Sequence, residues 1–124
     1  MLTGQYSHSL DAKGRVNFPA RLREELGERF VITRGLDSCL FVYSMEEWKL
    51  LADKLHQLPI SKSAALSRFF FAGAAEVEPD KQGRVLLPAH LREYAGLERD
   101  VVIAGVSNRA EIWDSARWEQ QNQL

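Results

Sequence analysis

The 124-residue sequence has a single cysteine, Cys39, so no disulfide can form within the chain and a reducing compartment is expected. No segment approaches the roughly 20 apolar residues of a membrane span, and the first residues lack the layout of a signal peptide. The three histidines are scattered, without cysteine or carboxylate partners at metal-ligand spacing. Phosphate-binding glycine loops, nucleophile elbows and zinc-protease motifs are also missing. These absences predict a cytoplasmic protein that is not an enzyme, needs no cofactor or metal, and binds neither a membrane nor a small-molecule substrate.

The sequence also has almost no net charge, because 16 Lys and Arg residues face 17 Asp and Glu residues, for a formal charge of −1. The charge is unevenly distributed. Residues 11–23 carry +3 and residues 80–92 carry +2, so the rest of the chain is acidic. An isolated charged run usually marks a solvated surface, but here the basic excess falls on two related segments. Localised positive potential of this kind indicates a phosphate-binding surface.

The two basic segments are copies of each other. At an offset of 69, DAKGRVNFPARLR and DKQGRVLLPAHLR share eight identities in 13 positions. The similarity predicts two tandem units, residues 1–48 and 73–124, joined by a helical connector, residues 49–72. Each unit has about 50 residues, which is near the lower limit for an independent hydrophobic core. The two units are therefore expected to interlock.

Each copy predicts a strand, a tight turn, a second strand and a short helix. Asp at the first position and Gly at the fourth are typical of a type I turn, so 11–14 and 80–83 are expected to be hairpin tips that each present a lysine. In the strand that follows, alternation places Val16 and Phe18 on one face and Arg15 and Asn17 on the other. Further along, Ser44 to Glu47 has the form of a capping box that begins a helix.

The Asp-x-x-x-Arg element of each copy has two interpretations. In one, Asp11 and Asp80 shape the tips while Arg15 and Arg84 point outward to a phosphate or a guanine edge. In the other, the ion pair only fixes the turn. A catalytic carboxylate pair is disfavoured, because each aspartate is already explained by its turn. Near the helix ends, Arg23 and Arg92 are expected to make intramolecular contacts.

Three stretches identify a family: the doubled DxxGRVxφPAxLR block, the connector ending RFFFAGAAE, and GVSNRAEIWD. Together they closely resemble the MraZ family, the tandem members of the SpoVT/AbrB-like group, over essentially the whole chain. The resemblance implies an α+β, mainly β fold in which two AbrB-like units form an intrachain pseudo-dimeric, swapped-hairpin β-barrel with short helices and a helical connector.

The resemblance also implies a function. MraZ proteins are bacterial, nucleoid-associated transcriptional regulators of the cell-division and cell-wall (dcw) gene cluster, and they bind short direct repeats in double-stranded DNA upstream of their own operon. They form ring-like homo-oligomers, of which an octamer-like ring is one form. The family's DNA-binding motif falls on Asp11, Arg15, Asp80 and Arg84, and turn geometry adds Lys13 and Lys81.

Two alternatives come from other functional classes. AbrB-like barrels also occur as antitoxins that bind a protein, but such chains usually have one unit and a long disordered tail. A purely structural ring protein would have no reason to keep both Arg15 and Arg84.

Overall fold

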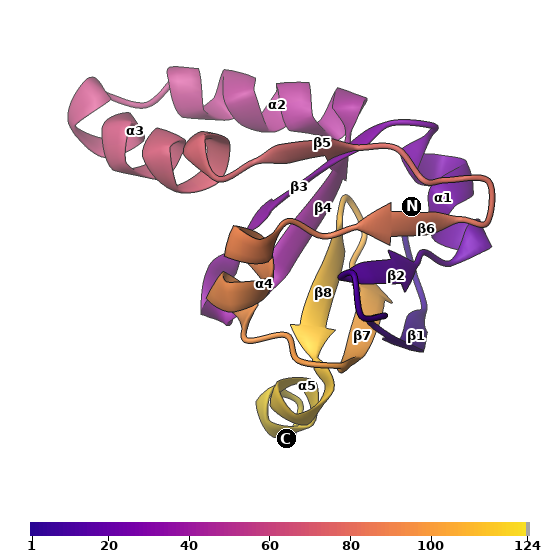
Figure 1. Ribbon diagram of the computed structural model, residues 1–124. Coiled ribbons are helices and arrows are strands. Elements are labelled where there is room, and N and C mark those ends of the chain that lie inside the picture. Colours follow the sequence, from indigo (N-terminus) through magenta and orange to yellow (C-terminus); the bar gives the residue numbers. More distant parts are fainter. Residues whose placement is uncertain (124) are drawn as a thin grey trace.

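Two antiparallel β-sheets organise residues 1–123, the part of the chain that this computed structural model describes (Figure 1). The larger sheet has six strands in the order β1-β7-β8-β4-β3-β5, and β2 and β6 form a separate two-stranded sheet. The strands are β1 (Gln5–Ser9), β2 (Arg15–Asn17), β3 (Phe30–Arg34), β4 (Leu40–Ser44), β5 (Ala75–Val77), β6 (Arg84–Leu86), β7 (Asp100–Gly105) and β8 (Ala110–Asp114). The α+β, mainly β class predicted from the sequence is confirmed.

Several strand pairs join the two repeats to each other. Strand β1 of the first repeat pairs with β7 of the second, and β5 of the second pairs with β3 of the first. The small sheet takes one strand from each repeat, with Val16 opposite Val85. Backbone donors and acceptors in a sheet require a neighbouring strand. Neither repeat therefore completes its own hydrogen bonding alone.

The closed barrel that the resemblance implied is not formed within residues 1–123, because the larger sheet is open. Its edges are β1 and β5, which each pair on one side only. The physical reason lies in the two tips, 11–14 and 80–83. After each tip the chain leaves the large sheet and enters β2 or β6, so these strands pair with each other instead of extending an edge.

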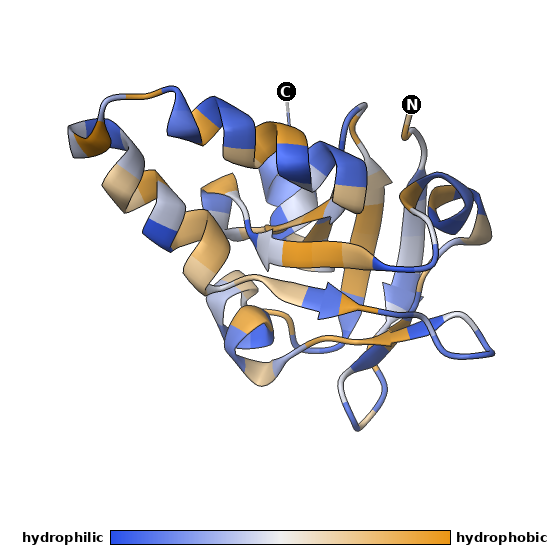
Figure 2. Ribbon diagram, turned by 90° about the horizontal axis from the view of Figure 1, so that it is seen from above, coloured by the Kyte–Doolittle hydropathy of each residue, from blue (hydrophilic) through white to orange (hydrophobic). Residues whose placement is uncertain are grey.

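Helices close the ends of the strands and connect the repeats. They are α1 (Ala20–Leu26), η1 (Leu36–Ser38), α2 (Met45–His56), α3 (Ile60–Ser67), the π-helical turn η2 (Arg68–Ala72), α4 (Ala89–Ala95) and α5 (Ser115–Gln121). The predicted cap of α2 is confirmed, because the Ser44 side chain accepts a hydrogen bond from the Glu47 N–H at 3.1 Å. The far ends of α2 and α3 project beyond the sheets (Figures 1 and 2). Within the described residues, no helix is long and apolar enough to cross a membrane.

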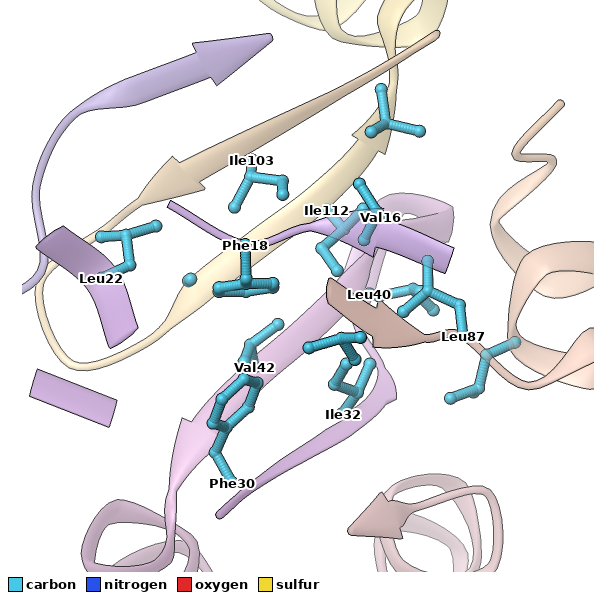
Figure 3. Close-up of a cluster of buried hydrophobic side chains, with 14 of the residues drawn as sticks. Val16, Phe18, Leu22, Phe30, Ile32, Leu40, Val42, Leu87, Ile103 and Ile112 are labelled. Carbon is cyan, nitrogen blue, oxygen red and sulfur yellow. The ribbon is translucent and has the colours of Figure 1, made fainter. Parts of the chain in front are cut away.

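The main hydrophobic core lies between the sheets and draws on both repeats. Val16 and Phe18 are 1% and 2% exposed, and the ring of Phe18 lies 5.1 Å from that of Phe30. Figure 3 shows Leu87 and Ile103 of the second repeat in the same cluster. The alternation predicted for residues 15–18 is therefore confirmed, since Asn17 is exposed and its two neighbours are buried.

A second cluster attaches the helical connector to the larger sheet. Phe70 of η2 stacks on Phe41 at 6.3 Å, and Trp48 of α2 packs against Phe71 at 4.8 Å. Cys39 is fully buried in this cluster, as expected for a small core residue.

Leu86 and Leu87 test which face of the β2–β6 sheet is buried, because they are adjacent in sequence but one is exposed and the other buried. Leu87 is 0% exposed and Leu86 is 57% exposed. We expect Leu87→Ala to lower the free energy of unfolding by about 2–5 kcal/mol, since it empties a packed site. Leu86→Ala should change it by less than about 0.5 kcal/mol. Urea unfolding of both variants measures the difference, and equal losses would contradict the fold.

Candidate nucleic-acid interface

Each tip is built around one aspartate. In the first tip, Asp11 Oδ1 accepts hydrogen bonds from the backbone N–H groups of Lys13 at 2.9 Å and Arg15 at 2.8 Å. The Gly14 N–H donates to the Asp11 carbonyl at 3.0 Å, which closes the four-residue turn. Gly14 has φ = +85°, a conformation that favours glycine. The tight turn predicted at 11–14 is therefore present.

The second tip repeats this geometry almost atom for atom. Asp80 Oδ1 accepts from the N–H groups of Gln82 and Arg84, both at 2.9 Å. The Gly83 N–H donates to the Asp80 carbonyl, also at 2.9 Å, and Gly83 has φ = +80°. The two tips thus present the same backbone frame to solvent.

The second carboxylate oxygen of each aspartate binds an arginine. Arg15 Nε donates to Asp11 Oδ2 at 2.7 Å, and Arg84 Nε donates to Asp80 Oδ2 at 2.9 Å. The arginine side chains remain 30% and 33% exposed. Within residues 1–123, the terminal nitrogens of both guanidinium groups make no hydrogen bond. The ion pair therefore orients each arginine and leaves its terminal N–H groups for an outside acceptor.

Local hydrogen bonds also set the charge of the aspartates. The backbone N–H of Arg15 is the largest influence on Asp11, and with the Arg15 side chain it holds the pKa of that carboxyl below its usual 3.8. Desolvation acts in the opposite direction and is outweighed. Asp80 has a lowered pKa for the same reasons, with Arg84 as its partner. Both carboxylates are therefore ionised at neutral pH.

The β2–β6 ribbon brings the two tips into one surface. Arg15 lies opposite Leu86 and Asn17 lies opposite Arg84, and these four side chains share the outer face of the ribbon. The inner face is Val16 and Val85, both buried. Each tip leads directly into one strand of the ribbon (Figure 1). The structure thus places Arg15 and Arg84 on one face.

Lys13 and Lys81 are exposed on the tips. Neither lysine forms an ion pair within the described part of the chain. The six residues predicted from the sequence therefore lie at the two ends of one short ribbon.

Two further arginines approach the tips from the opposite repeat. Arg92 Nε donates to the Leu87 carbonyl at 3.0 Å, which confirms its intramolecular role. Its guanidinium also lies against Gly14 of the other repeat, where an added Cβ would be 2.8 Å from Arg92 Cζ. Arg23 has the same position at Gly83, at 3.0 Å. The sequence repeat identified Arg23 and Arg92 as matching residues. It could not show that each arginine contacts the tip of the other repeat.

An open groove beside the second tip has the wrong charge for phosphate. The groove has a volume of about 620 Å³, and charged groups in its lining are Arg23, Glu24, Glu28, Glu78 and Asp80. Four carboxylates against one guanidinium repel an anion. A phosphate is therefore expected on the outer face of the ribbon and at the tips. No group of three or more His, Cys, Asp or Glu side chains within residues 1–123 is arranged to hold a metal ion.

The aspartate pKa values can be measured residue by residue. We expect NMR titration of the side-chain carboxyl carbons to give midpoints below 3.8 for Asp11 and Asp80. Because the pKa is lowered on folding, the stabilisation is present above the unfolded pKa and is lost as pH falls through the folded pKa. Arg15→Ala should raise the Asp11 midpoint in part, since the backbone donor remains. Asp80 should be unchanged in that variant, and Arg84→Ala should do the reverse. A shift of both midpoints in either variant would show that the tips are not independent.

Gly14→Ala tests the contact between a tip and the opposite repeat. Alanine at φ = +85° is strained, and its Cβ would displace the Arg92 guanidinium from the Leu87 carbonyl. Gly96→Ala is a matched control, with φ = +63° and no atom within 4 Å of the new Cβ. We expect a loss of about 1 kcal/mol in unfolding free energy for Gly96→Ala. Gly14→Ala should lose about 1 kcal/mol more because a hydrogen bond is also broken. Equal losses in urea unfolding would argue against the Arg92 contact.

Comparison with known proteins identifies the family of the chain. A family model described as "MraZ protein, putative antitoxin-like" matches residues 1–67 and 70–124. "Transcriptional regulator MraZ" of Caldanaerobacter subterraneus subsp. tengcongensis is 59% identical over 122 residues, covering 97% of this chain and 85% of that protein. The protein of the same name from Acetivibrio thermocellus is 61% identical over 121 residues, covering 96% and 85%. That from Thermoanaerobacter sp. strain X514 is 61% identical over 122 residues, covering 97% and 85%. With both halves of the chain matched and relatives this similar along nearly its full length, the chain belongs to the MraZ family.

Proposed function

We propose that this chain is a DNA-binding transcriptional regulator that contacts double-stranded DNA through the β2–β6 ribbon and its two tips. The observation that carries the proposal is the pair of tips on one ribbon with the same Asp–Arg geometry, each with terminal guanidinium N–H groups that bind nothing within residues 1–123. Relatives at about 60% identity carry the name transcriptional regulator. A regulator acts by recognising DNA, so its surface must offer groups that bind phosphates and bases.

The ribbon has a suitable shape for the major groove of B-DNA, which admits a two-stranded β-ribbon. Arg15 and Arg84 would donate two parallel hydrogen bonds to a phosphate or to the O6 and N7 atoms of guanine. Lys13 and Lys81 would contact phosphates as point charges. The aspartates would act indirectly, by fixing the direction of each arginine.

The proposed domain organisation, DNA targets and assembly are those that the resemblance to the MraZ family implies. The proposed units are residues 1–48 and 73–124 with a connector at 49–72, and the strand exchange between them corresponds to a swapped-hairpin pseudo-dimer. The proposed targets are short direct repeats upstream of the chain's own operon in the dcw cluster, bound in the nucleoid. The proposed assembly is a ring-like homo-oligomer.

Surface chemistry supports a ring. Leu50, Leu58, Ile60 and Leu66 are exposed on the projecting α2–α3 connector, where a neighbouring subunit could cover them. A contact between unlike surfaces of successive subunits closes into a ring when the rotation permits. A ring would present many tips to several DNA repeats at once, and effective concentration would strengthen weak individual contacts.

Fluorescence anisotropy tests the DNA-binding role. Wild type, Arg15→Ala and Arg84→Ala are titrated onto a duplex from upstream of the chain's own gene and onto a scrambled duplex, at several salt concentrations. We expect wild type to prefer the native duplex and each variant to bind at least about tenfold more weakly. The slope of log affinity against log salt should also fall by about one for each lost phosphate contact.

Lys49→Ala is the matched control, because Lys49 is an exposed positive charge on α2, away from the tips. It should bind the native duplex as wild type does. If wild type binds both duplexes equally, or if the tip variants behave like Lys49→Ala, the arginines serve only the fold. The search would then move to a protein partner.

A further inference from the structure

The outer face of the ribbon is symmetric at two of its four positions and asymmetric at the other two. The offset of 69 makes Arg15 equivalent to Arg84, and Asn17 equivalent to Leu86. The register places Arg15 opposite Leu86 and Asn17 opposite Arg84. The arginines therefore occupy one diagonal of the face, and an amide and an aliphatic side chain occupy the other.

Neither Asn17 nor Leu86 has a visible role in the fold. Leu86 is 57% exposed, although the leucine beside it is fully buried. Asn17 is exposed, and its side-chain amide makes no hydrogen bond within the described part of the chain. Each lies directly opposite an arginine, where side chains across an antiparallel pair are about 5 Å apart. Any group that binds Arg15 or Arg84 is therefore also within reach of Leu86 or Asn17.

We propose that Asn17 and Leu86 determine the DNA sequence that the ribbon reads. This inference rests on the proposed DNA-binding function. Asn17 would donate to and accept from the N7 and N6 atoms of an adenine, which is the pairing that an asparagine amide makes in the major groove. Leu86 would pack on the C5-methyl group of a thymine, the apolar feature of that groove. Arg15 and Arg84 would hold the ribbon in place on both sides.

The spacing of side chains along the ribbon matches the spacing of bases in DNA. Arg15 and Asn17 are two residues apart on one strand, about 6.8 Å at 3.4 Å per residue. Successive bases on one DNA strand are about 3.4 Å apart. Two side chains on the same face therefore match two base-pair steps, and the three-residue ribbon spans about three base pairs.

The asymmetry predicts the form of the recognised element. If both ends of each diagonal carried the same side chain, the ribbon would read the same bases after a half-turn, and its element would be two-fold symmetric. Asn17 and Leu86 are chemically unlike, so the two orientations on DNA differ in free energy. The element is therefore oriented and not palindromic, and a ribbon bound to it has one preferred direction along the duplex.

Selection from a duplex library tests the inference. Wild type, Leu86→Asn, Asn17→Leu and the double exchange are each used to enrich duplexes of about 20 base pairs whose central positions are randomised, followed by sequencing. We expect wild type to enrich an oriented element. Leu86→Asn puts asparagine at both ends of the second diagonal, so it should enrich a two-fold symmetric element with adenine replacing thymine at the affected position. Asn17→Leu puts leucine at both ends of the same diagonal, so it should lose the adenine preference by about tenfold and enrich a two-fold symmetric element with thymine in its place.

The double exchange should restore the wild-type element, because the two strands of the ribbon have traded their corner residues. All four proteins should have the same dependence of affinity on salt, since no charge is changed. Leu36→Asn on η1 is the matched control for an exposed leucine, since Leu36 is 58% exposed, and it should enrich the wild-type element. Circular dichroism melting should show that every variant is folded.

The outcomes separate the two proposals. If the single variants Leu86→Asn and Asn17→Leu enrich the wild-type element, Asn17 and Leu86 do not read bases, and the inference falls while DNA binding stands. A symmetric element for wild type would overturn the inference in the same way. If wild type binds no duplex and shows no loss on Arg15→Ala, the proposed function itself falls, and this inference falls with it.

Discussion

The hydrogen-bonded register between β2 and β6 is the constraint on which the rest of the structure depends. Pairing Val16 with Val85 sends both valines into the core and leaves the arginines outside. A slip of one residue would reverse the faces, bury a guanidinium and expose the valines. The backbone bonds from Phe18 N–H to the Gly83 carbonyl and from Leu87 N–H to the Gly14 carbonyl extend the same ladder to both tips. Fold and candidate site are thus fixed by one set of bonds.

The sequence predicted the local structure correctly, but it did not predict which distant segments pack against each other. The Asp11 turn, the burial of Val16 and the α2 cap follow from residues within four positions of each other, so a single sequence contains their causes. Periodicity tells which face of a strand is buried but not which strand lies beside it. The closed barrel was therefore wrong, and the placement of Arg92 against Gly14 was not anticipated.

The two repeats are alike in sequence but have different surroundings, because only one connector exists. Phe41 stacks on Phe70 of the connector and also lies under the Arg109 guanidinium, 4.4 Å from its Cζ. Opposite Phe41 in the ladder is Glu111, which accepts from Arg109 Nη2 at 2.8 Å and from the Trp113 indole N–H at 2.9 Å. A buried carboxylate requires such donors. Where Phe41 makes aromatic contacts, the residue opposite it in the ladder therefore makes a polar network.

The exchange of strands also constrains the order of events during protein synthesis. Tyr6 pairs with Ile103, so the first strand to leave the ribosome must wait for almost the whole chain before its partner exists. During that interval its backbone N–H and C=O groups have no partner strand, and the valines and phenylalanines of the first repeat are not yet fully buried. Long-range pairing of this kind slows folding and lengthens exposure to other nascent chains. Each ribbon strand is followed by one seven-residue helix, α1 or α4, which is too short to be stable on its own, so the apolar residues stay exposed until the second repeat arrives.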